Sequence, residues 1–180
     1  MRIFISLKTT PYEEELFKVE SQIKPYYSNV KWVEKENLHI TLKFLGEVDE
    51  EFIYNLNNII QGISARFLPF SFSISGISGF PKLEYARVIF FSIEDQSAYI
   101  SLIMREIDRA LKDFGFEREK SYIPHITFGR VKNGAIDLSR TESPTLLIES
   151  KAIGIKVVQS ILRPEGPLYK VISQFMFNEL

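Results

Sequence analysis

The sequence predicts an α+β protein in which two pseudo-symmetric lobes, each an antiparallel sheet with helices on its outer face, surround a central cleft. Segments with strand-like alternation are interleaved with segments that repeat apolar residues at helical spacing. The order strand, helix, linking segment and His-x-Thr strand occurs twice. We therefore expect residues 1–180 to form a single bilobal domain, with lobes of roughly 1–80 and 81–180; exchange of strands between the lobes is left open.

The first strand is predicted at residues 2–7, where "RIFISL" is mostly apolar. A helix should follow, with Thr10 as its N-cap, Pro11 at its first position and Glu13 completing a capping box. Pro25 should end this helix because proline cannot continue it.

Two strands joined by a polar turn are predicted at residues 30–33 and 38–46. Asp49 is then the expected cap of a helix whose apolar residues recur at helical spacing between 52 and 63. A strand follows at 70–76, where "FSFSISG" alternates with period two.

The second half repeats this pattern. A buried strand is predicted at 86–93, and the most regular amphipathic helix of the chain at 100–114, ended by Gly115. A strand should cover 122–131, and the tail at 150–178 reads as two strands around a Pro/Gly turn.

Composition narrows the class of protein. Apolar residues make up 45% and charged residues 25% of the chain, which is typical of a globular protein. The formal net charge of −1 argues against a protein that coats nucleic acid through its overall field, although a local basic cleft remains compatible with it. Without cysteine, disulfides and thiolate metal sites are excluded. We expect a cytoplasmic monomer that does not associate with membranes.

The most informative stretch is "NLHITLKFLGEV", residues 37–48. In a strand, residues two apart share one face, so His39 and Thr41 should project together. The only other histidine lies in "SYIPHITFGRVK", where His125 and Thr127 repeat the arrangement. From composition, both histidines being followed by Ile-Thr has a probability on the order of 10⁻⁵, so coincidence is a poor explanation.

Two imidazoles that face each other across a cleft can serve as general base and general acid in one reaction. Threonine hydroxyls beside them can donate hydrogen bonds to the non-bridging oxygens of a phosphate, and phosphoryl transfer depends mainly on such positioning. A neighbouring 2′-hydroxyl or an already cyclic phosphate would make a metal unnecessary. We predict no cofactor. A zinc site formed with distant acids stays open, although neither motif adds a ligand at i+2 or i+4. No G-x-S-x-G segment supports a serine hydrolase.

With these motifs in view, the sequence resembles the two-histidine (2H) phosphoesterases, and within them the RNA 2′,3′-cyclic phosphodiesterases, also called 2′-5′ RNA ligases. The resemblance runs nearly from end to end and includes "RIFISL", "VKWVEKENLHITLKFLG", "GFPKLEYARVIFF", "GFEREKSYIPHITFGRV" and "EGPLYKVI".

The resemblance implies a bilobal α+β fold whose two H-x-T strands line a central groove. It also implies hydrolysis of 2′,3′-cyclic phosphates at RNA ends, or in cyclic nucleotides, to 2′-phosphomonoesters, and reversible 2′-5′ ligation in some members. His39 and His125 carry over as catalytic residues, and Thr41 and Thr127 as phosphate-binding residues. The resemblance assigns His125 as base and His39 as acid.

Four further residues are candidates for binding substrate. Arg130 ends the second motif strand, where it could reach a phosphate as a bidentate donor. Arg87 opens an apolar strand, and Lys43 shares parity with His39 and Thr41, so it could extend the phosphate-facing surface. Tyr122 could stack on a base. Each has an ordinary alternative: a solvated charge for Arg130 and Lys43, pairing with an acid at the sheet edge for Arg87, and a core position for Tyr122, as for most aromatic residues of the chain.

Three functions remain open: a metal-independent RNA cyclic phosphodiesterase, a phosphodiesterase for a small cyclic phosphate or a 2′-5′ oligonucleotide, and a non-catalytic module that binds RNA ends. The presence of both histidines and both threonines favours the enzymes, because binding alone does not need two titratable groups. If the histidines act as acid and base, the pH profile should be bell-shaped, with limbs around 6 to 8.

Overall fold

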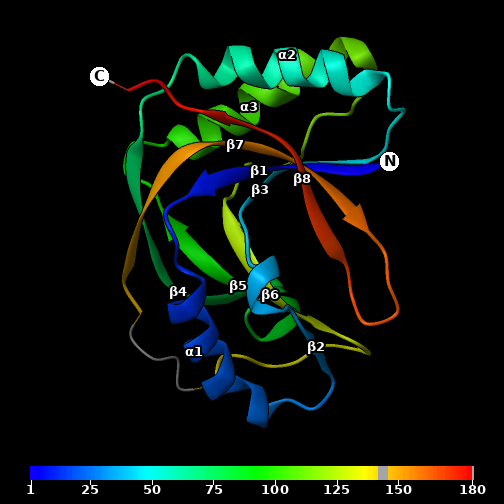
Figure 1. Ribbon diagram of the computed structural model, residues 1–180. Helices are drawn as coiled ribbons and strands as arrows, with labels where there is room; N and C mark the ends of the chain where they lie inside the picture. The colour runs from blue at the N-terminus through cyan, green and yellow to red at the C-terminus, as the bar shows by residue number, and fades with distance from the viewer. Residues whose placement is uncertain (142–145, 180) are drawn as a thin grey trace.

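A computed structural model describes residues 1–141 and 146–179. In these ranges the chain forms eight β-strands and three α-helices (Figure 1). The strands are β1 (Arg2–Thr9), β2 (Val30–Trp32), β3 (Thr41–Glu47), β4 (Phe70–Lys82), β5 (Tyr85–Glu94), β6 (His125–Val131), β7 (Ile148–Ile161) and β8 (Leu168–Met176). The helices are α1 (Glu13–Ile23), α2 (Phe52–Ser64) and α3 (Tyr99–Leu111), with short 3₁₀ turns at Lys24–Tyr26, Lys35–Asn37 and Lys112–Phe114. The predicted α+β class is confirmed.

The strands join in one antiparallel sheet with the order β2-β6-β5-β4-β7-β1-β3, and β8 pairs with β7. The long strand β7 comes from the second half of the sequence but pairs with β1 from the first half and with β4. Strand β4 in turn pairs with β5. Strands from the two halves of the sequence therefore pair with each other in one sheet, and β3 and β6, which carry the motif threonines, lie far apart in the strand order.

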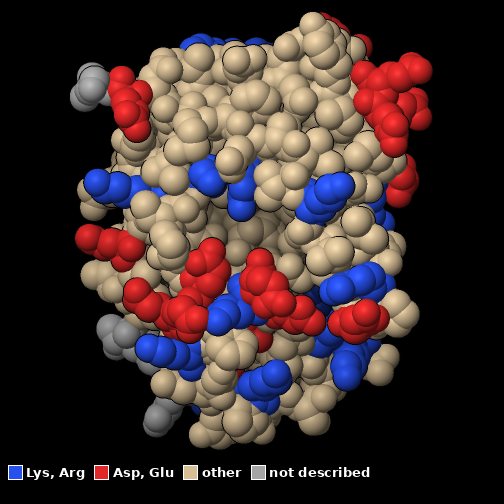
Figure 2. All heavy atoms as spheres, viewed as in Figure 1, with Lys and Arg blue, Asp and Glu red and all other residues tan. Residues whose placement is uncertain are grey.

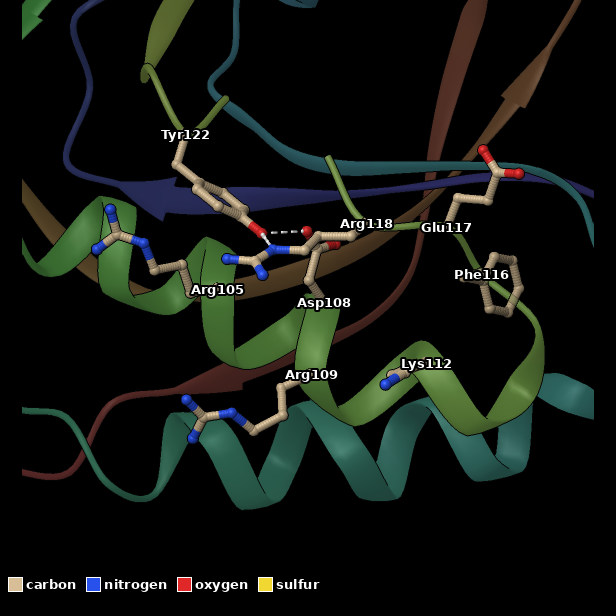
Figure 3. Close-up of a pocket in the computed structure, with 8 residues that line it drawn as sticks. All are labelled: Arg105, Asp108, Arg109, Lys112, Phe116, Glu117, Arg118 and Tyr122. Carbon is tan, nitrogen blue, oxygen red and sulfur yellow. Dashed lines mark hydrogen bonds between the residues drawn. The ribbon is translucent and has the colours of Figure 1, made fainter. Parts of the chain in front are cut away.

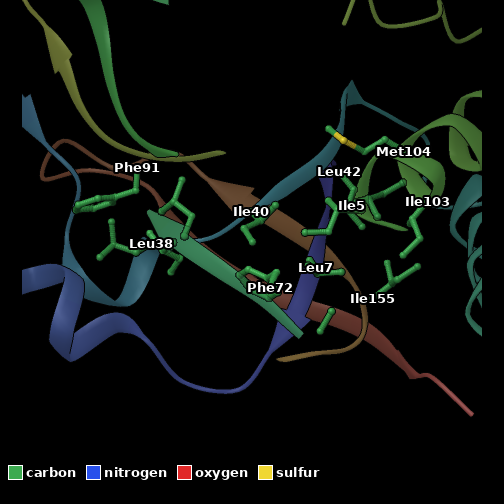
Figure 4. Packing of buried hydrophobic residues seen from close by; sticks show 14 of the residues in the cluster. Ile5, Leu7, Leu38, Ile40, Leu42, Phe72, Phe91, Ile103, Met104 and Ile155 are labelled. Atoms are coloured by element: carbon green, nitrogen blue, oxygen red, sulfur yellow. The ribbon is translucent and has the colours of Figure 1, made fainter. Parts of the chain in front are cut away.

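The helices cover the sheet at two ends. Helices α2 and α3 lie side by side at the top of Figure 1, and α1 lies at the opposite end. Helix α3 contacts β3, and α2 contacts β7 and β8. The apolar stripe predicted for α3 is buried, including Ile103 and Met104, which pack near Leu42 of β3 (Figure 4). Gly115 ends this segment with a φ of +88°, a conformation that favours glycine.

The predicted capping box at the first helix is wrong. The hydroxyl of Thr10 faces β7, where it lies 3.0 Å from the Ser150 hydroxyl and accepts a hydrogen bond from the backbone N–H of Lys151 at 2.9 Å. The chain thus pairs with β7 up to Thr10, and α1 begins only at Glu13. Tertiary pairing outweighs the local capping signal here.

The second predicted cap is also displaced. Helix α2 begins at Phe52, and Asp49 contributes its backbone carbonyl, which accepts from the N–H of Phe52 at 3.0 Å. Strand β3 begins at Thr41, three residues later than predicted, so His39 lies just before it. The turn at Lys35–Asn37 shapes this approach.

Candidate active site

A groove of about 480 Å³ brings both histidine motifs together. Residues from four parts of the chain line it: β1, the start of β3, β6 and the β7–β8 hairpin. The lining residues are Arg2, Phe4, His39, Thr41, Phe44, His125, Thr127, Arg130, Ser160, Leu162, Pro167 and Tyr169. Two arginines and no acidic side chain stand among these described residues, so the groove is electropositive and suits an anion.

This local charge differs from that of the whole chain, whose formal net charge is −1. On the face drawn in Figure 2, Lys and Arg side chains form a band across the middle, and below it Asp and Glu side chains are mixed with further Lys and Arg. The near-neutral total therefore coexists with a local excess of positive charge at the groove, where Arg2 and Arg130 have no acidic neighbour among the described lining residues.

The ring of His39 is fixed through its Nδ1 atom, which lies 2.6 Å from the carbonyl oxygen of Asn37. A carbonyl oxygen only accepts, so Nδ1 carries the proton in this hydrogen bond. The opposite atom, Nε2, lies 2.8 Å from the Thr41 hydroxyl. The rings of Phe4 and Tyr169 pack against the imidazole with centroids 4.8 and 5.3 Å away.

His125 has matching surroundings. Its Nδ1 lies 2.8 Å from the carbonyl oxygen of Ile123, again two residues earlier in the chain. Phe80 and Phe90 pack edge-on against this ring, with centroids 5.1 and 5.2 Å away. In both motifs, backbone and aromatic contacts hold the ring and Nδ1 is occupied, so proton transfer falls to Nε2, which in His39 also lies against the Thr41 hydroxyl.

Burial lowers the pKa of both imidazoles. For His39, desolvation is the main cause, with smaller contributions from the charges of Lys156 and Arg130, and the pKa falls from 6.5 to about 4 despite the hydrogen bond to Asn37. For His125, desolvation again lowers the pKa, and Arg130 adds to the effect. Both imidazoles are therefore neutral at pH 7 in the free protein.

A β-bulge follows each motif threonine. On β3, Ser6 of β1 stands opposite Thr41 and Ile5 opposite Lys43, which leaves Leu42 without a partner. On β6, the pairing with β5 likewise passes over Phe128. A bulge reverses the alternation of side chains beyond it.

The bulge on β3 explains why the prediction for Lys43 is wrong. Leu42 and Lys43 are consecutive and both buried, and the Lys43 side chain points away from the groove toward Asp108 of α3. Phe44 takes the place facing the groove beside Thr41. Because the regular period of two fails at this point, parity could not identify the residue beyond it.

The structure brings Arg130 into the groove with the four motif residues and leaves two other candidates outside it. Arg87 is exposed on β5, where its guanidinium lies 5.3 Å from the ring centroid of Tyr85. Tyr122 lies in a different cavity and donates a hydrogen bond to Asp108. The side chain of Arg87 projects to solvent, although its strand β5 pairs with β6. Tyr122 lies three residues before β6 begins, so the alternation along that strand does not apply to it.

Sequence reasoning missed Arg2, Phe4, Phe44 and Tyr169. Alternation in "RIFISL" places Arg2 and Phe4 on the face opposite the buried Ile3 and Ile5, and this signal was available. The guanidinium of Arg2 lies 5.0 Å from the ring centroid of Phe44. Tyr169 enters the groove from β8, a contact that depends on tertiary structure alone.

Comparison with known proteins adds an independent line of evidence. Residues 7–90 match the family described as LigT like Phosphoesterase. The chain is 37% identical to a protein of Methanocaldococcus jannaschii named RNA 2′,3′-cyclic phosphodiesterase, over 97% of this chain and 100% of the relative. A protein of Thermotoga maritima with the same name is 32% identical over 99% and 96% of the two chains.

Solved structures agree on the fold. A crystal structure from Thermus thermophilus superposes with a TM-score of 0.86 at 26% identity and covers 98% of both chains. Escherichia coli LigT complexed with 3′-AMP has a TM-score of 0.78 at 17% identity, over 99% and 98% of the two chains, which shows a shared fold. The end-to-end similarity to named relatives, together with this fold, establishes that the chain belongs to the LigT-like phosphoesterases of the two-histidine (2H) superfamily.

Proposed function

We propose that this protein hydrolyses 2′,3′-cyclic phosphates at RNA ends, or in cyclic nucleotides, to 2′-phosphomonoesters. The observation that carries the proposal is the convergence of two His-x-Thr motifs from different strands on one electropositive groove. The names of the relatives in Methanocaldococcus jannaschii and Thermotoga maritima support the choice of substrate, as does the 3′-AMP bound by a LigT of the same fold.

In the proposed mechanism, His125 and His39 act as base and acid. The Nε2 atom of His125 takes a proton from water as the water oxygen bonds to phosphorus. The bond between phosphorus and the 3′-oxygen breaks, and protonated Nε2 of His39 gives its proton to that oxygen. The products are a 2′-phosphomonoester and a free 3′-hydroxyl, and each histidine has changed its protonation state once.

Other groove residues supply positioning and charge. The hydroxyls of Thr41 and Thr127 would donate to the non-bridging phosphate oxygens, and the Arg130 guanidinium would neutralise their charge. In the free protein, Nε2 of neutral His39 accepts from the Thr41 hydroxyl. When Nε2 is protonated it no longer accepts, so the Thr41 hydroxyl would be released to donate to the phosphate while the Nε2 proton goes to the 3′-oxygen.

The low pKa of His39 is consistent with an acid that is charged only when substrate is bound. Burial keeps this imidazole neutral in the free protein. A cyclic phosphate carries a negative charge, and an anion in the groove favours the imidazolium form of both histidines. The proton that the reaction needs would thus be taken up together with the substrate.

Two other activities use the same groups. The reverse direction would join a 2′-phosphate to a 5′ partner, giving 2′-5′ ligation, and a small cyclic phosphate or a 2′-5′ oligonucleotide would meet the same base and acid. A non-catalytic module that binds RNA ends is the alternative from another class. The hydrogen bonds at Nδ1 of both rings favour catalysis, because they orient each Nε2 toward the groove, with only the exchangeable Thr41 hydroxyl beside that of His39.

Turnover separates these possibilities. We expect cyclic-phosphate-ended oligonucleotides and 2′,3′-cyclic mononucleotides to be hydrolysed faster than 2′-5′ oligonucleotides or ADP-ribose cyclic phosphate. Tight binding of the oligonucleotide without any turnover would identify a binding module instead. Faster hydrolysis of ADP-ribose cyclic phosphate than of the RNA substrates would identify a small molecule as the substrate.

A further inference from the structure

The buried side chain of Asp108 links the two histidine motifs from the far side of the sheet. Asp108 lies on α3 and is 5% exposed, and Lys43 on β3 is 3% exposed. The Lys43 ammonium donates to Oδ1 of Asp108 at 2.5 Å. The other carboxylate oxygen, Oδ2, accepts from the Tyr122 hydroxyl at 2.7 Å and from the backbone N–H of Glu119 at 2.9 Å. One carboxylate therefore contacts both the first motif strand and the segment that leads to the second.

The contact with β3 acts on the first motif through its bulge. Lys43 follows Thr41 by two positions, and the bulge turns it away from the groove. The ammonium also donates to the carbonyl oxygen of Glu117 at 2.8 Å. These bonds hold Lys43 on the α3 side, and the bulged backbone then directs Thr41 and Phe44 into the groove.

The contact with Tyr122 acts on the second motif. Its hydroxyl is bonded to Asp108 and its carbonyl oxygen accepts from the Ser101 hydroxyl of α3 at 2.9 Å. The next residue, Ile123, supplies the carbonyl oxygen that orients His125. Figure 3 shows Tyr122 above α3 with its hydroxyl directed at Asp108 and Arg118.

The buried ion pair of Lys43 and Asp108 contributes little to the free energy of unfolding for the hydration that it loses. A buried ion pair loses hydration that the attraction between the charges only partly restores, and apolar residues of similar volume are often as stable. At the corresponding place after the second motif the chain has Gly129, packed against Val30 and Ile89, with no charge. The pair is thus not a general requirement of the bulge.

We propose that Asp108 is a positioning residue that sets both histidine motifs, through Lys43 on one side and Tyr122 on the other. The inference deepens the proposed function, since it rests on His39 and His125 being the reacting groups. Hydrogen bonds from Lys43, Glu119 and Tyr122 keep Asp108 ionised: although burial raises its pKa, these donors outweigh that effect and lower it.

The decisive variant is Lys43→Met combined with Asp108→Leu. It removes both charges together, so neither is left buried alone. Because Leu is larger than Asp and does not accept from Tyr122 and Glu119, circular dichroism and a thermal melt accompany the kinetics, and only a folded variant counts. We expect kcat to fall by about 10-fold or more with KM within about twofold, because misplaced groups slow the reaction more than they weaken binding. Tyr122→Phe removes one hydroxyl and should give a smaller loss of the same kind. Tyr27→Phe is the matched control: its hydroxyl bonds to Asp137 and Thr141, outside the groove.

A second readout does not depend on activity. Nitrogen-15 NMR of the two histidines reports which ring nitrogen carries the proton, and we expect the Nδ1–H form for both in the unmodified protein. Tyr122→Phe should disturb the His125 signals, the double variant should disturb both histidines, and Tyr27→Phe should disturb neither. A folded double variant with unchanged kcat and unchanged histidine signals would overturn the positioning role. If the unmodified protein proves inactive on cyclic phosphates while the NMR changes occur, the proposed function fails and the positioning role stands.

Discussion

Phe44 and Arg130 occupy corresponding positions in the two motif strands, each five residues after its histidine and just beyond a bulge. Both line the groove. The pseudo-symmetry of the histidines and threonines thus breaks at this pair: one side of the groove ends in an aromatic ring and the other in a guanidinium. The Phe44 ring in turn carries the guanidinium of Arg2, 5.0 Å from its centroid, so the two sides of the groove present their positive charges differently.

Substitution of Arg130 should reduce activity, whereas substitution of Arg87, the other arginine identified in the sequence, should not. We expect Arg130→Ala to reduce kcat/KM for a cyclic-phosphate substrate by roughly 10- to 100-fold, the scale of losing a hydrogen bond to a charged group. Arg87→Ala should have no effect, because Arg87 projects to solvent beside Tyr85. Steady-state kinetics on 2′,3′-cyclic AMP would measure both. Equal losses in the two variants would contradict the placement of the site.

The limbs of the profile of kcat/KM against pH should lie at lower pH than two histidines with ordinary pKa values would give. Because desolvation lowers the pKa of His39 and of His125, protonation of the free enzyme is lost as the pH rises toward 6.5. We expect the alkaline limb of kcat/KM below pH 6.5, and that of kcat at higher pH because the bound phosphate favours the imidazolium form. This differs from the limbs around 6 to 8 that the sequence alone suggested.

Arg130 offers a control for this profile. Its positive charge lowers the pKa of both histidines, so Arg130→Ala should move the limbs to higher pH. Arg87→Ala should leave them in place. An alkaline limb of kcat/KM at or above pH 7 in the unmodified enzyme would show that burial does not govern these histidines.

The burial of Glu20 on α1, away from the groove, should make the free energy of unfolding depend on pH. This buried carboxyl on α1 has one oxygen without a hydrogen-bond partner in the described chain, and desolvation raises its pKa from 4.5 to about 7, although Lys24 opposes the shift. The folded state therefore binds the proton more tightly than the unfolded state. Stability from this group is present below pH 4.5, falls as the pH rises, and is lost above about 7.

Glu20→Gln removes the ionisation. We expect it to raise the free energy of unfolding at pH 8 by at most about 3 kcal/mol and to change little at pH 4, as urea denaturation would measure. Glu15→Gln on the exposed side of the same helix is the control and should leave the pH dependence unchanged. A Glu20→Gln effect of equal size at both pH values would point to packing instead of ionisation.

Local patterns were sufficient for the class of fold, and they drew attention to the two His-x-Thr pairs, which the structure places in one groove. The catalytic role of these four residues stays a prediction. Lys43 lies just beyond the irregularity in β3, and no local signal marks the bulge that buries it. Thr10 carried a valid capping signal, but pairing with Lys151 across the sheet outweighs it. Tyr169 reaches the groove only because β8 folds back on β7.

The pairing partners of β7 could not be predicted from local sequence patterns either. Its pairing with both β1 and β4 joins the halves of the chain into one sheet, and partner choice between strands depends on the whole topology. The end of the helical segment formed by α3 and the following 3₁₀ turn shows the opposite case, since Gly115 marks it through backbone conformation alone.

The most direct test of the account is the fate of 2′,3′-cyclic AMP, followed by phosphorus-31 NMR in buffer containing EDTA, with the unmodified protein and with His39→Ala and His125→Ala. We expect the unmodified protein to produce 2′-AMP at a rate that EDTA does not change. Each variant, shown to be folded by circular dichroism, should be slower by at least about 10²-fold, the scale of losing a general acid or base. Formation of 2′-AMP by either variant at the unmodified rate, or loss of activity in EDTA with recovery on adding zinc, would contradict the two-histidine mechanism.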